Sequence, residues 1–306
     1  MEAYQIFLQQ IVNGLAIGVI YALIALGYTM VYGVIQLINF AHGEVFMVGA
    51  YLGFALFQWI GIAAQPAGST LLWFLPLLFV FAALGCGLLG LVIERVAYRP
   101  LRNAPRLVPL ITAIGVSFVL QNAVMLIFGA DDKSFPPLFP QVRFTFLNVS
   151  ITLLQIFILV VSFLLMVGLH LFVQKTRWGK AMRACSDDLV AARVVGIGVN
   201  KTIAMAFFIG SCLAGVGGIL FGMYYNTINF HDGYLAGMKA FTAAVLGGVG
   251  NIPGAMLGGI LIGLLEGLGA GYLSAEWKNV FAFVVLIVVL LVRPSGILGE
   301  RVAKKV

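Results

Sequence analysis

Two short segments of this chain combine polar and ionisable residues in surroundings that are almost entirely apolar. Both begin with the tripeptide INF, and their polar members are Asn39, His42, Glu44, Asn229, His231 and Asp232. Each segment lies where a helix is predicted to begin after a glycine-containing bend, and a helix start offers free N–H groups that suit a carboxylate. Two interpretations remain open. The six residues line a substrate pathway made of broken helices, or the Asn and Asp side chains simply cap helix ends.

Motifs for catalysis and for metal binding are absent from the sequence. No HExxH, GxSxG or CxxC occurs, and no GxxxxGK[ST] loop is present to hold the phosphates of a nucleotide. The cysteines Cys86, Cys185 and Cys212 lie far apart in or beside apolar stretches, so we interpret them as buried apolar side chains. We therefore expect no enzymatic activity, no cofactor and no metal in this chain.

A third polar segment, residues 179–201, reads GKAMRACSDDLVAARVVGIGVNK. Its apolar residues recur at helical spacing, which predicts a short amphipathic helix over about 186–195. Ser186 or Asp187 would cap the start of this helix, and Gly196 and Gly198 would end it. Such a helix is either a docking point for a partner or a helix that lies on the membrane surface.

The composition places the chain in a membrane. Of its 306 residues, 62% are apolar and only 9% are charged, and the mean hydropathy is +1.07. A soluble globule of this composition would have too little polar surface to face water, so this class is excluded. Disordered chains contain few apolar residues, so disorder is excluded as well. Long unbroken apolar runs exclude an outer-membrane barrel, because apolar and polar residues alternate along the strands of such a barrel. The sequence therefore predicts an all-α, polytopic transmembrane helical bundle that forms one domain over residues 1–306.

Apolar runs of the length needed to cross a bilayer predict eight or nine spans. They lie at about 8–33, 44–62, 70–93, 107–128, 151–174, 201–225, 234–250, 254–273 and 277–292. The seventh and ninth runs are short, which is typical of half-helices that do not cross fully. The first run follows MEAYQIF, which has no basic residue, so we predict a retained span rather than a cleaved signal peptide.

The net charge of +7 is explained by topology. Most Lys and Arg residues lie in three segments, namely 94–106, 175–201 and the tail from residue 293. Because basic loops stay in the cytoplasm, the C-terminus is predicted inside and the N-terminus outside. No basic surface for nucleic acid is needed to account for the charge, and we predict no nucleic-acid partner.

The two INF segments belong to an internal repeat. Residues 38–51 read INFAHGEVFMVGAY and residues 228–241 read INFHDGYLAGMKAF, which aligns Asn39 with Asn229 and Gly43 with Gly233. The predicted topology places the first copy on the inner side and the second on the outer side, as in the inverted repeats of transporters. The repeat halves would cover about 8–128 and 201–292. The match is short, so a chance similarity is the alternative.

One predicted span carries glycine at every fourth position and a single carboxylate. The glycines are Gly259, Gly263, Gly267 and Gly271. Glycines at this spacing form a flat ridge that lets another helix approach closely, so we predict helix packing along this ridge. Glu266 in the same span faces either a polar cavity or an adjacent helix, and the sequence does not decide between them.

The sequence resembles a known family of membrane permeases. INFAHGEVFMVGAY (38–51) resembles the signature of branched-chain amino-acid permeases, and the stretches 14–33, 94–102 and 244–259 fit the same family. The pattern that runs from Arg183 to Ile197 resembles the cytoplasmic loop of permeases from bacterial ABC importers. The resemblance covers essentially the whole chain and is closest to the H-type subunit of the leucine, isoleucine and valine importer.

This resemblance implies a complex and a site. A second related permease, two cytoplasmic ATPases that hydrolyse ATP and a periplasmic binding protein would accompany this chain in the bacterial inner membrane. The coupling helix would seat in an ATPase groove, and its residues would be Arg183, Asp187, Asp188, Ala192, Gly196 and Ile197. Three of them, Asp188, Ala192 and Gly196, recur at a spacing of four and are expected to line one docking face. Asp187 stands where relatives often have Glu, which keeps the charge.

Other functions remain as alternatives to the import of branched-chain amino acids. Permeases for urea and short amides look similar to this family. A secondary transporter without ATPases would have no need of a capped helix at 183–197, and it would more often carry buried charges through its spans. A membrane-embedded enzyme is disfavoured because no set of nucleophile and base is present.

Overall fold

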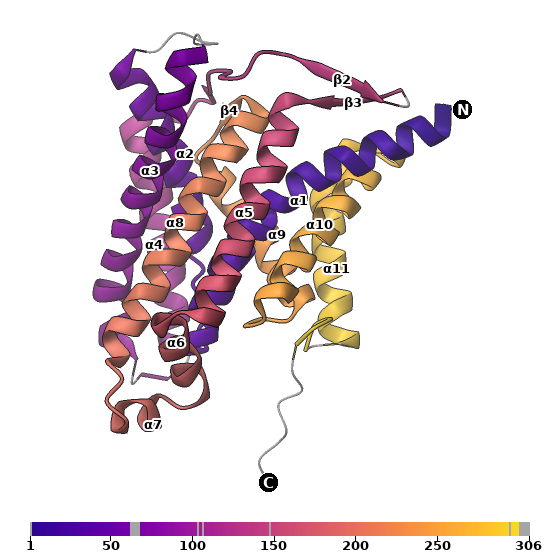
Figure 1. The fold of residues 1–306 in the computed structure, drawn as a ribbon. Helices are drawn as coiled ribbons and strands as arrows, with labels where there is room; N and C mark the ends of the chain where they lie inside the picture. Colours follow the sequence, from indigo (N-terminus) through magenta and orange to yellow (C-terminus); the bar gives the residue numbers. More distant parts are fainter. Residues whose placement is uncertain are drawn as a thin grey trace.

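The computed structural model describes residues 2–61, 68–102, 104–105, 107–146, 148–293 and 295–299, and this part of the chain is mostly helical (Figure 1). The first helices are α1 (Glu2–Ile35), α2 (His42–Ile60), α3 (Gly68–Ile93), the π-helix η1 (Glu94–Tyr98), the 3-10 helix η2 (Arg99–Leu101) and α4 (Leu107–Phe128). The middle helices are α5 (Leu153–Lys175), α6 (Arg177–Asp187) and α7 (Leu189–Val194). The last are α8 (Val199–Tyr225), α9 (Asp232–Gly247), α10 (Ile252–Tyr272), the 3-10 helix η3 (Ala275–Trp277) and α11 (Lys278–Val292).

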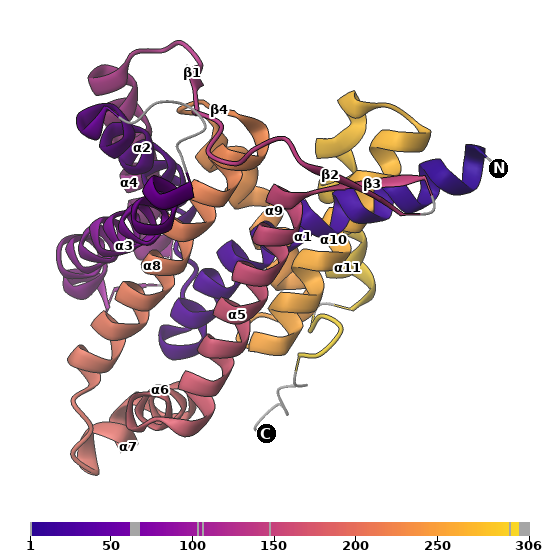
Figure 2. The same ribbon diagram turned by 45° about the horizontal axis from the view of Figure 1, so that its top comes forward.

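Four short strands lie at the end of the molecule that holds the N-terminus (Figures 1 and 2). They are β1 (Lys133–Ser134), β2 (Arg143–Phe146), β3 (Val149–Thr152) and β4 (Thr227–Ile228). β1 pairs with β4 and β2 with β3, both antiparallel. The Gln9 side chain exchanges hydrogen bonds with the backbone of Ser150, at 2.9 and 3.0 Å. These bonds tie the start of α1 to the β2–β3 hairpin.

Seven of the described helical segments are long and apolar enough to cross a membrane. They are α1, α2, α3 with its π and 3-10 extension, α4, α5, α8 and α10. The all-α polytopic bundle is therefore confirmed. α9 and α11 have only 16 and 15 residues, and they correspond to the two runs predicted to be short.

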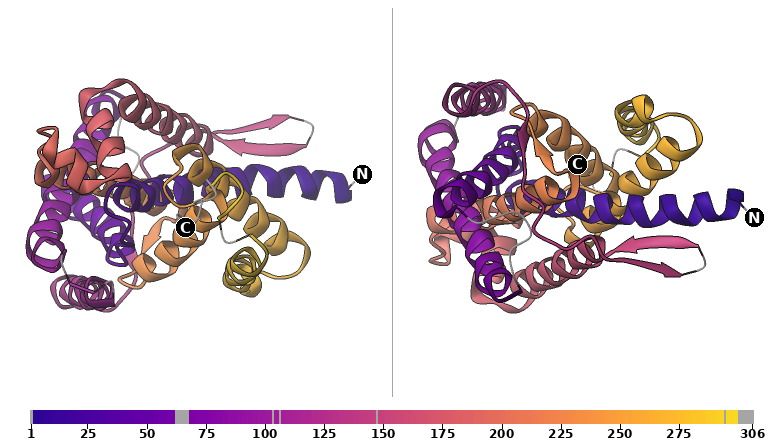
Figure 3. Two further views of the ribbon diagram at one scale, coloured as in Figure 1. Left: turned by 90° about the horizontal axis from the view of Figure 1, so that it is seen from below. Right: turned by 90° about the horizontal axis from the view of Figure 1, so that it is seen from above.

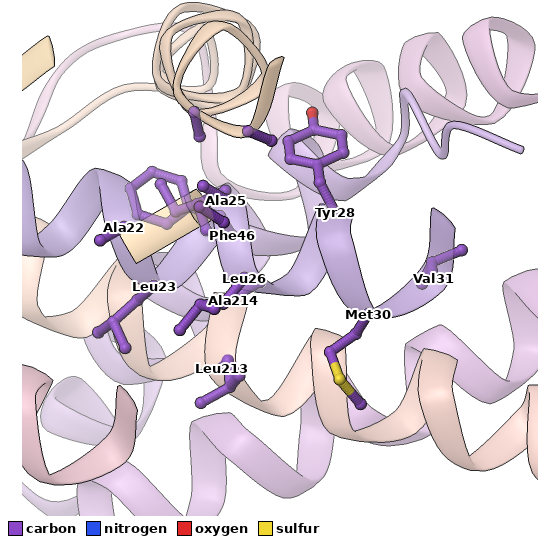
Figure 4. Packing of buried hydrophobic residues seen from close by; sticks show 14 of the residues in the cluster. Ala22, Leu23, Ala25, Leu26, Tyr28, Met30, Val31, Phe46, Leu213 and Ala214 are labelled. Carbon is purple, nitrogen blue, oxygen red and sulfur yellow. The ribbon is translucent and has the colours of Figure 1, made fainter. Parts of the chain in front are cut away.

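α1 is the centre of the bundle and is buried along most of its length. It packs along α10 through the predicted glycine ridge, because side chains at these positions would collide with the opposite backbone. A Cβ atom at Gly14 would lie 2.8 Å from the carbonyl oxygen of Gly263, and one at Gly18 would lie 3.0 Å from Ile260 Cα. On another side α1 contacts Phe46 of α2 and Leu213 of α8 (Figure 4).

Helix packing is matched between the two halves of the chain. α1 packs on α10 and α3 packs on α8, while α2 contacts α4 and α9 contacts α11. α1 runs from the strand end toward α6, whereas α8 runs from α7 back to the strand end (Figures 1 and 2). Figure 3 shows the same bundle from its two ends. Corresponding helices are thus antiparallel, which is the geometry expected of an inverted repeat. The boundaries 8–128 and 201–292 stay a prediction.

Candidate functional site

α2 and α9 both begin inside the bundle, where their first turns cross. A Cβ atom at Gly237 would lie 2.8 Å from Gly43 Cα, and one at Gly43 would collide with the carbonyl oxygen of Gly233. Only glycine allows the two backbones to approach this closely. From the crossing α2 leads toward the strand end and α9 toward the end that holds α6 (Figure 1). Two helix N-termini therefore meet at one point.

The two INF segments form the same turn ahead of these helices. The backbone N–H of Ala41 donates to Asn39 Oδ1 at 3.1 Å, and that of His231 donates to Asn229 Oδ1 at 2.8 Å. The N–H of His42 donates to the Asn39 carbonyl oxygen at 3.0 Å, and that of Asp232 to the Asn229 carbonyl oxygen at 3.1 Å. The matching bonds support the predicted repeat at atomic detail.

Three of the six polar residues shape the turns themselves. Asn39 Oδ1 also accepts from the Tyr98 hydroxyl at 3.2 Å. Asn229 Nδ2 donates to Asp132 Oδ1 at 2.5 Å, and Asp232 Oδ2 accepts from the Asn229 N–H at 2.7 Å. Asn39, Asn229 and Asp232 thus stabilise the turns that precede the helices, and neither α2 nor α9 has a side-chain hydrogen bond at its N-cap residue.

The other three residues lie where α2 and α9 face α4 and α1. Glu44 is only 1% exposed, and its Oε1 accepts from Ser117 Oγ of α4 at 3.2 Å. The His231 ring is exposed, and its Nδ1 lies 2.7 Å from Gln121 Nε2. The buried His42 ring packs edge-on against Tyr28 of α1, with 4.9 Å between centroids. A Cβ atom at Gly27 would collide with that ring, so this glycine leaves the space for His42.

A buried ion pair that the sequence analysis missed lies deeper in the bundle. Lys239 Nζ of α9 is 3.0 Å from Glu266 Oε2 of α10, and the Tyr21 hydroxyl of α1 donates to the same oxygen at 2.9 Å. All three side chains are buried. Glu266 therefore faces the adjacent helices α9 and α1 and not a polar cavity. The sequence feature that could have revealed this pair is Lys239, the single Lys within the apolar run 234–250, because a lone buried cation requires a partner.

The predicted coupling segment forms two helices instead of one. α6 continues to Asp187, and the chain then becomes extended at Asp188, with φ −158° and ψ 115°. The prediction of Ser186 or Asp187 as the N-cap was wrong, because the Asp188 carboxylate accepts from the N–H groups of Val190 and Ala191 at 2.7 and 3.0 Å. Gly196 ends α7 as predicted, with φ at +88°, a conformation that favours glycine.

Ala192 faces inward, contrary to the predicted docking face. It is 3% exposed and belongs to the core cluster that includes Val199 and Ile203 of α8. The short α7 is held by this contact and by the bond from the Ile197 N–H to the Ala192 carbonyl oxygen at 3.0 Å. Asp188, Ala192 and Gly196 therefore do not share an exposed face.

The exposed side of α7 and the residue after it is apolar instead. We call this surface the α7 patch, and its members are Leu189, Val190, Val194 and Val195. Val190 is 72% exposed and Val194 is 82% exposed. Asp187 and Arg193 are exposed beside the patch. Arg183 instead points back to α5, where its guanidinium donates to the carbonyl oxygens of Val173 and Gln174.

The fold and these sites define a multi-pass membrane permease built around two helices, α2 and α9, that cross at their first turns. The sequence matches the family described as the branched-chain amino acid transport system permease component over residues 10–290, and the chain belongs to this family.

Near-full-length relatives have names of the same kind. The high-affinity branched-chain amino acid transport system permease protein BraD of Pseudomonas aeruginosa is 51% identical, over 98% of this chain and 98% of its own length. The corresponding protein LivH of Escherichia coli K12 is 48% identical, over 100% of this chain and 99% of its own length. A probable branched-chain amino acid transport permease protein LivH of Methanocaldococcus jannaschii is 31% identical, over 90% of this chain and 88% of its own length. No solved structure matches the chain.

Proposed function

We propose that this chain is the membrane-spanning subunit of an ATP-driven importer for leucine, isoleucine and valine. The observation that carries the proposal is the similarity to high-affinity branched-chain amino acid permeases along nearly the whole chain. This similarity favours branched-chain amino acids over urea or short amides as substrates. ATP hydrolysis belongs to separate cytoplasmic subunits, because the sequence carries no nucleotide-binding loop of its own.

The α7 patch is the proposed contact with an ATPase. Four apolar side chains on a short helix outside the spanning helices are costly in water and suit a hydrophobic groove. A second related permease and a periplasmic binding protein complete the proposed complex. The coupling role rests on the segment from Arg183 to Ile197 as a whole. Arg183 ties α6 to the end of α5, Ala192 anchors α7 in the core, and the valines make the proposed contact.

The end of the molecule that carries α6 and α7 is proposed to face the cytoplasm. Its Arg and Lys residues outnumber those at the strand end, and basic segments stay inside. The N-terminus then lies in the periplasm and the C-terminus in the cytoplasm of a bacterium. We expect a membrane-impermeant thiol reagent to label Pro140→Cys in intact cells and to label Val194→Cys only after the membrane is opened. Labelling of both in intact cells would contradict this orientation.

Uptake measures the proposed function directly. Cells that lack their own branched-chain amino acid uptake should accumulate labelled leucine, isoleucine and valine when this chain is expressed with its partner subunits. Accumulation should require an ATPase able to hydrolyse ATP, which a secondary transporter would not. Uptake of urea instead of leucine would favour the alternative within the same family, and uptake without ATPases would refute the proposal.

The pathway across the membrane is proposed to pass the crossing of α2 and α9. Here the chain leaves helical structure inside the bundle, and within a membrane non-helical backbone is tolerated only where it is buried in protein or lines a cavity. Asn39, Asn229 and Asp232 hold the two turns, while His42, Glu44 and His231 supply ionisable side chains beside the crossing.

A further inference from the structure

The Glu44 carboxylate has one oxygen that is buried without a partner. Oε1 accepts from Ser117, but Oε2 accepts from no donor within the described ranges. A charged group in this position costs free energy unless a hydrogen-bond donor or a cation reaches it during function. This contrasts with Glu266, whose Oε2 is paired with both Lys239 and Tyr21.

Unpaired donors lie directly beside this unpaired acceptor. The Glu44 carboxylate lies against Gly233, where a Cβ atom would be 2.9 Å from Glu44 Cδ. Gly233 and Tyr234 form the first turn of α9, and their backbone N–H groups have no acceptor in the part of the chain that the structure describes. Asp232, which could cap this turn, is bonded to the N–H of Asn229 instead. A buried carboxyl group with one unpaired oxygen and an open helix N-terminus therefore face the same point.

Two polar contacts close this point along α4. Ser117 meets Glu44, and Gln121, one helical turn nearer the strand end, meets His231 at 2.7 Å. Through these two contacts α4 lies against Glu44 of α2 and against His231, the residue that precedes α9. A ligand that displaced α4 from these two contacts would reach the carboxyl group and the first turn of α9 together.

We propose that Glu44 binds the ammonium group of a zwitterionic amino acid while the first turn of α9 binds its carboxylate. The ammonium group donates to Glu44 Oε2, and the N–H groups of Gly233 and Tyr234 donate to the substrate carboxylate, which the positive end of the α9 dipole also favours. Urea and short amides have neither charge, so this site selects the substrate class. The inference rests on the proposed function and specifies the chemistry of its pathway.

Glu44→Gln tests the ammonium contact while preserving the shape of the side chain. In the assembled transporter we expect leucine uptake to fall roughly 10- to 100-fold, the effect of losing a charge-assisted hydrogen bond. Glu44→Asp should retain part of the uptake because it keeps the charge. ATP hydrolysis stimulated by the loaded binding protein should persist in Glu44→Gln, which a general structural defect would not allow. Normal uptake in Glu44→Gln would overturn the proposal.

Ser162→Ala is the matched control for this variant. Its hydroxyl in α5 is also buried without a partner, but it lies away from the crossing, so uptake should stay at the level of the unmodified chain. A comparable loss in Ser162→Ala and Glu44→Gln would assign the effect to packing and reject the site.

A labelling experiment covers the case in which Glu44→Gln does not assemble. Ser117→Cys in the transporter should react faster with a cationic ethylammonium thiosulfonate than with a neutral methyl analogue, relative to the exposed Pro140→Cys, because the Glu44 carboxylate attracts the cation. Leucine delivered by the binding protein should slow this reaction. Equal preference at both positions without protection would reject the ammonium site. Absence of leucine uptake by the unmodified transporter would instead refute the proposed function, and the labelling would still measure the affinity of the site for cations.

Discussion

Replacing Val190 and Val194 together by aspartate is expected to abolish capture of the ATPases. Both valines are exposed, lie one turn apart on α7 and belong to the proposed contact. Seating them in an apolar groove would bury unpaired carboxylates, each at a cost of about 2–5 kcal/mol. Association should therefore weaken at least about 100-fold. The measurement is co-purification of the ATPases with the chain, together with leucine uptake.

Val142→Asp serves as the control for this pair. Val142 is also an exposed valine, but it lies beside β2 near the opposite end of the molecule. It should leave ATPase capture intact. If the Val190→Asp/Val194→Asp chain still recruits ATPases at the normal level, the α7 patch is not the contact, and the secondary-transporter alternative gains support.

Removing one member of the buried ion pair is expected to destabilise the whole bundle. Lys239→Met leaves the Glu266 carboxylate buried with only the Tyr21 hydroxyl as its partner. Breaking a buried pair in this way costs about 3–5 kcal/mol. We expect less folded protein in the membrane and a lower melting temperature of the purified chain in detergent.

The double variant Lys239→Met/Glu266→Leu separates charge pairing from packing. Apolar residues of similar size often replace a buried pair without loss of stability. We expect this variant to regain most of the melting temperature that Lys239→Met loses. If the double variant is as unstable as the single one, the pair does not act through compensation of charge. If Lys239→Met is as stable as the unmodified chain, the contact contributes nothing to folding.

The sequence by itself determined the class of fold and the position of its unusual points. Long apolar runs require helices in a bilayer, because only helices and closed barrels satisfy the backbone there. The two short runs correspond to the short helices α9 and α11, and the INF repeat corresponds to the matched turns before α2 and α9. Glycine spacing predicted close packing and is confirmed where Gly263 meets Gly14.

The partners of individual side chains were decided only by the tertiary structure. Lys239 and Glu266 are separated along the chain, and nothing in their local sequence shows that α9 and α10 turn them toward each other. The orientation of α7 shows the same limit. A six-residue helix has no strong amphipathic preference, so its packing on α8 turned Ala192 inward and left the valines exposed. Periodicity is local information, whereas the face that a short helix buries depends on residues far away in the sequence.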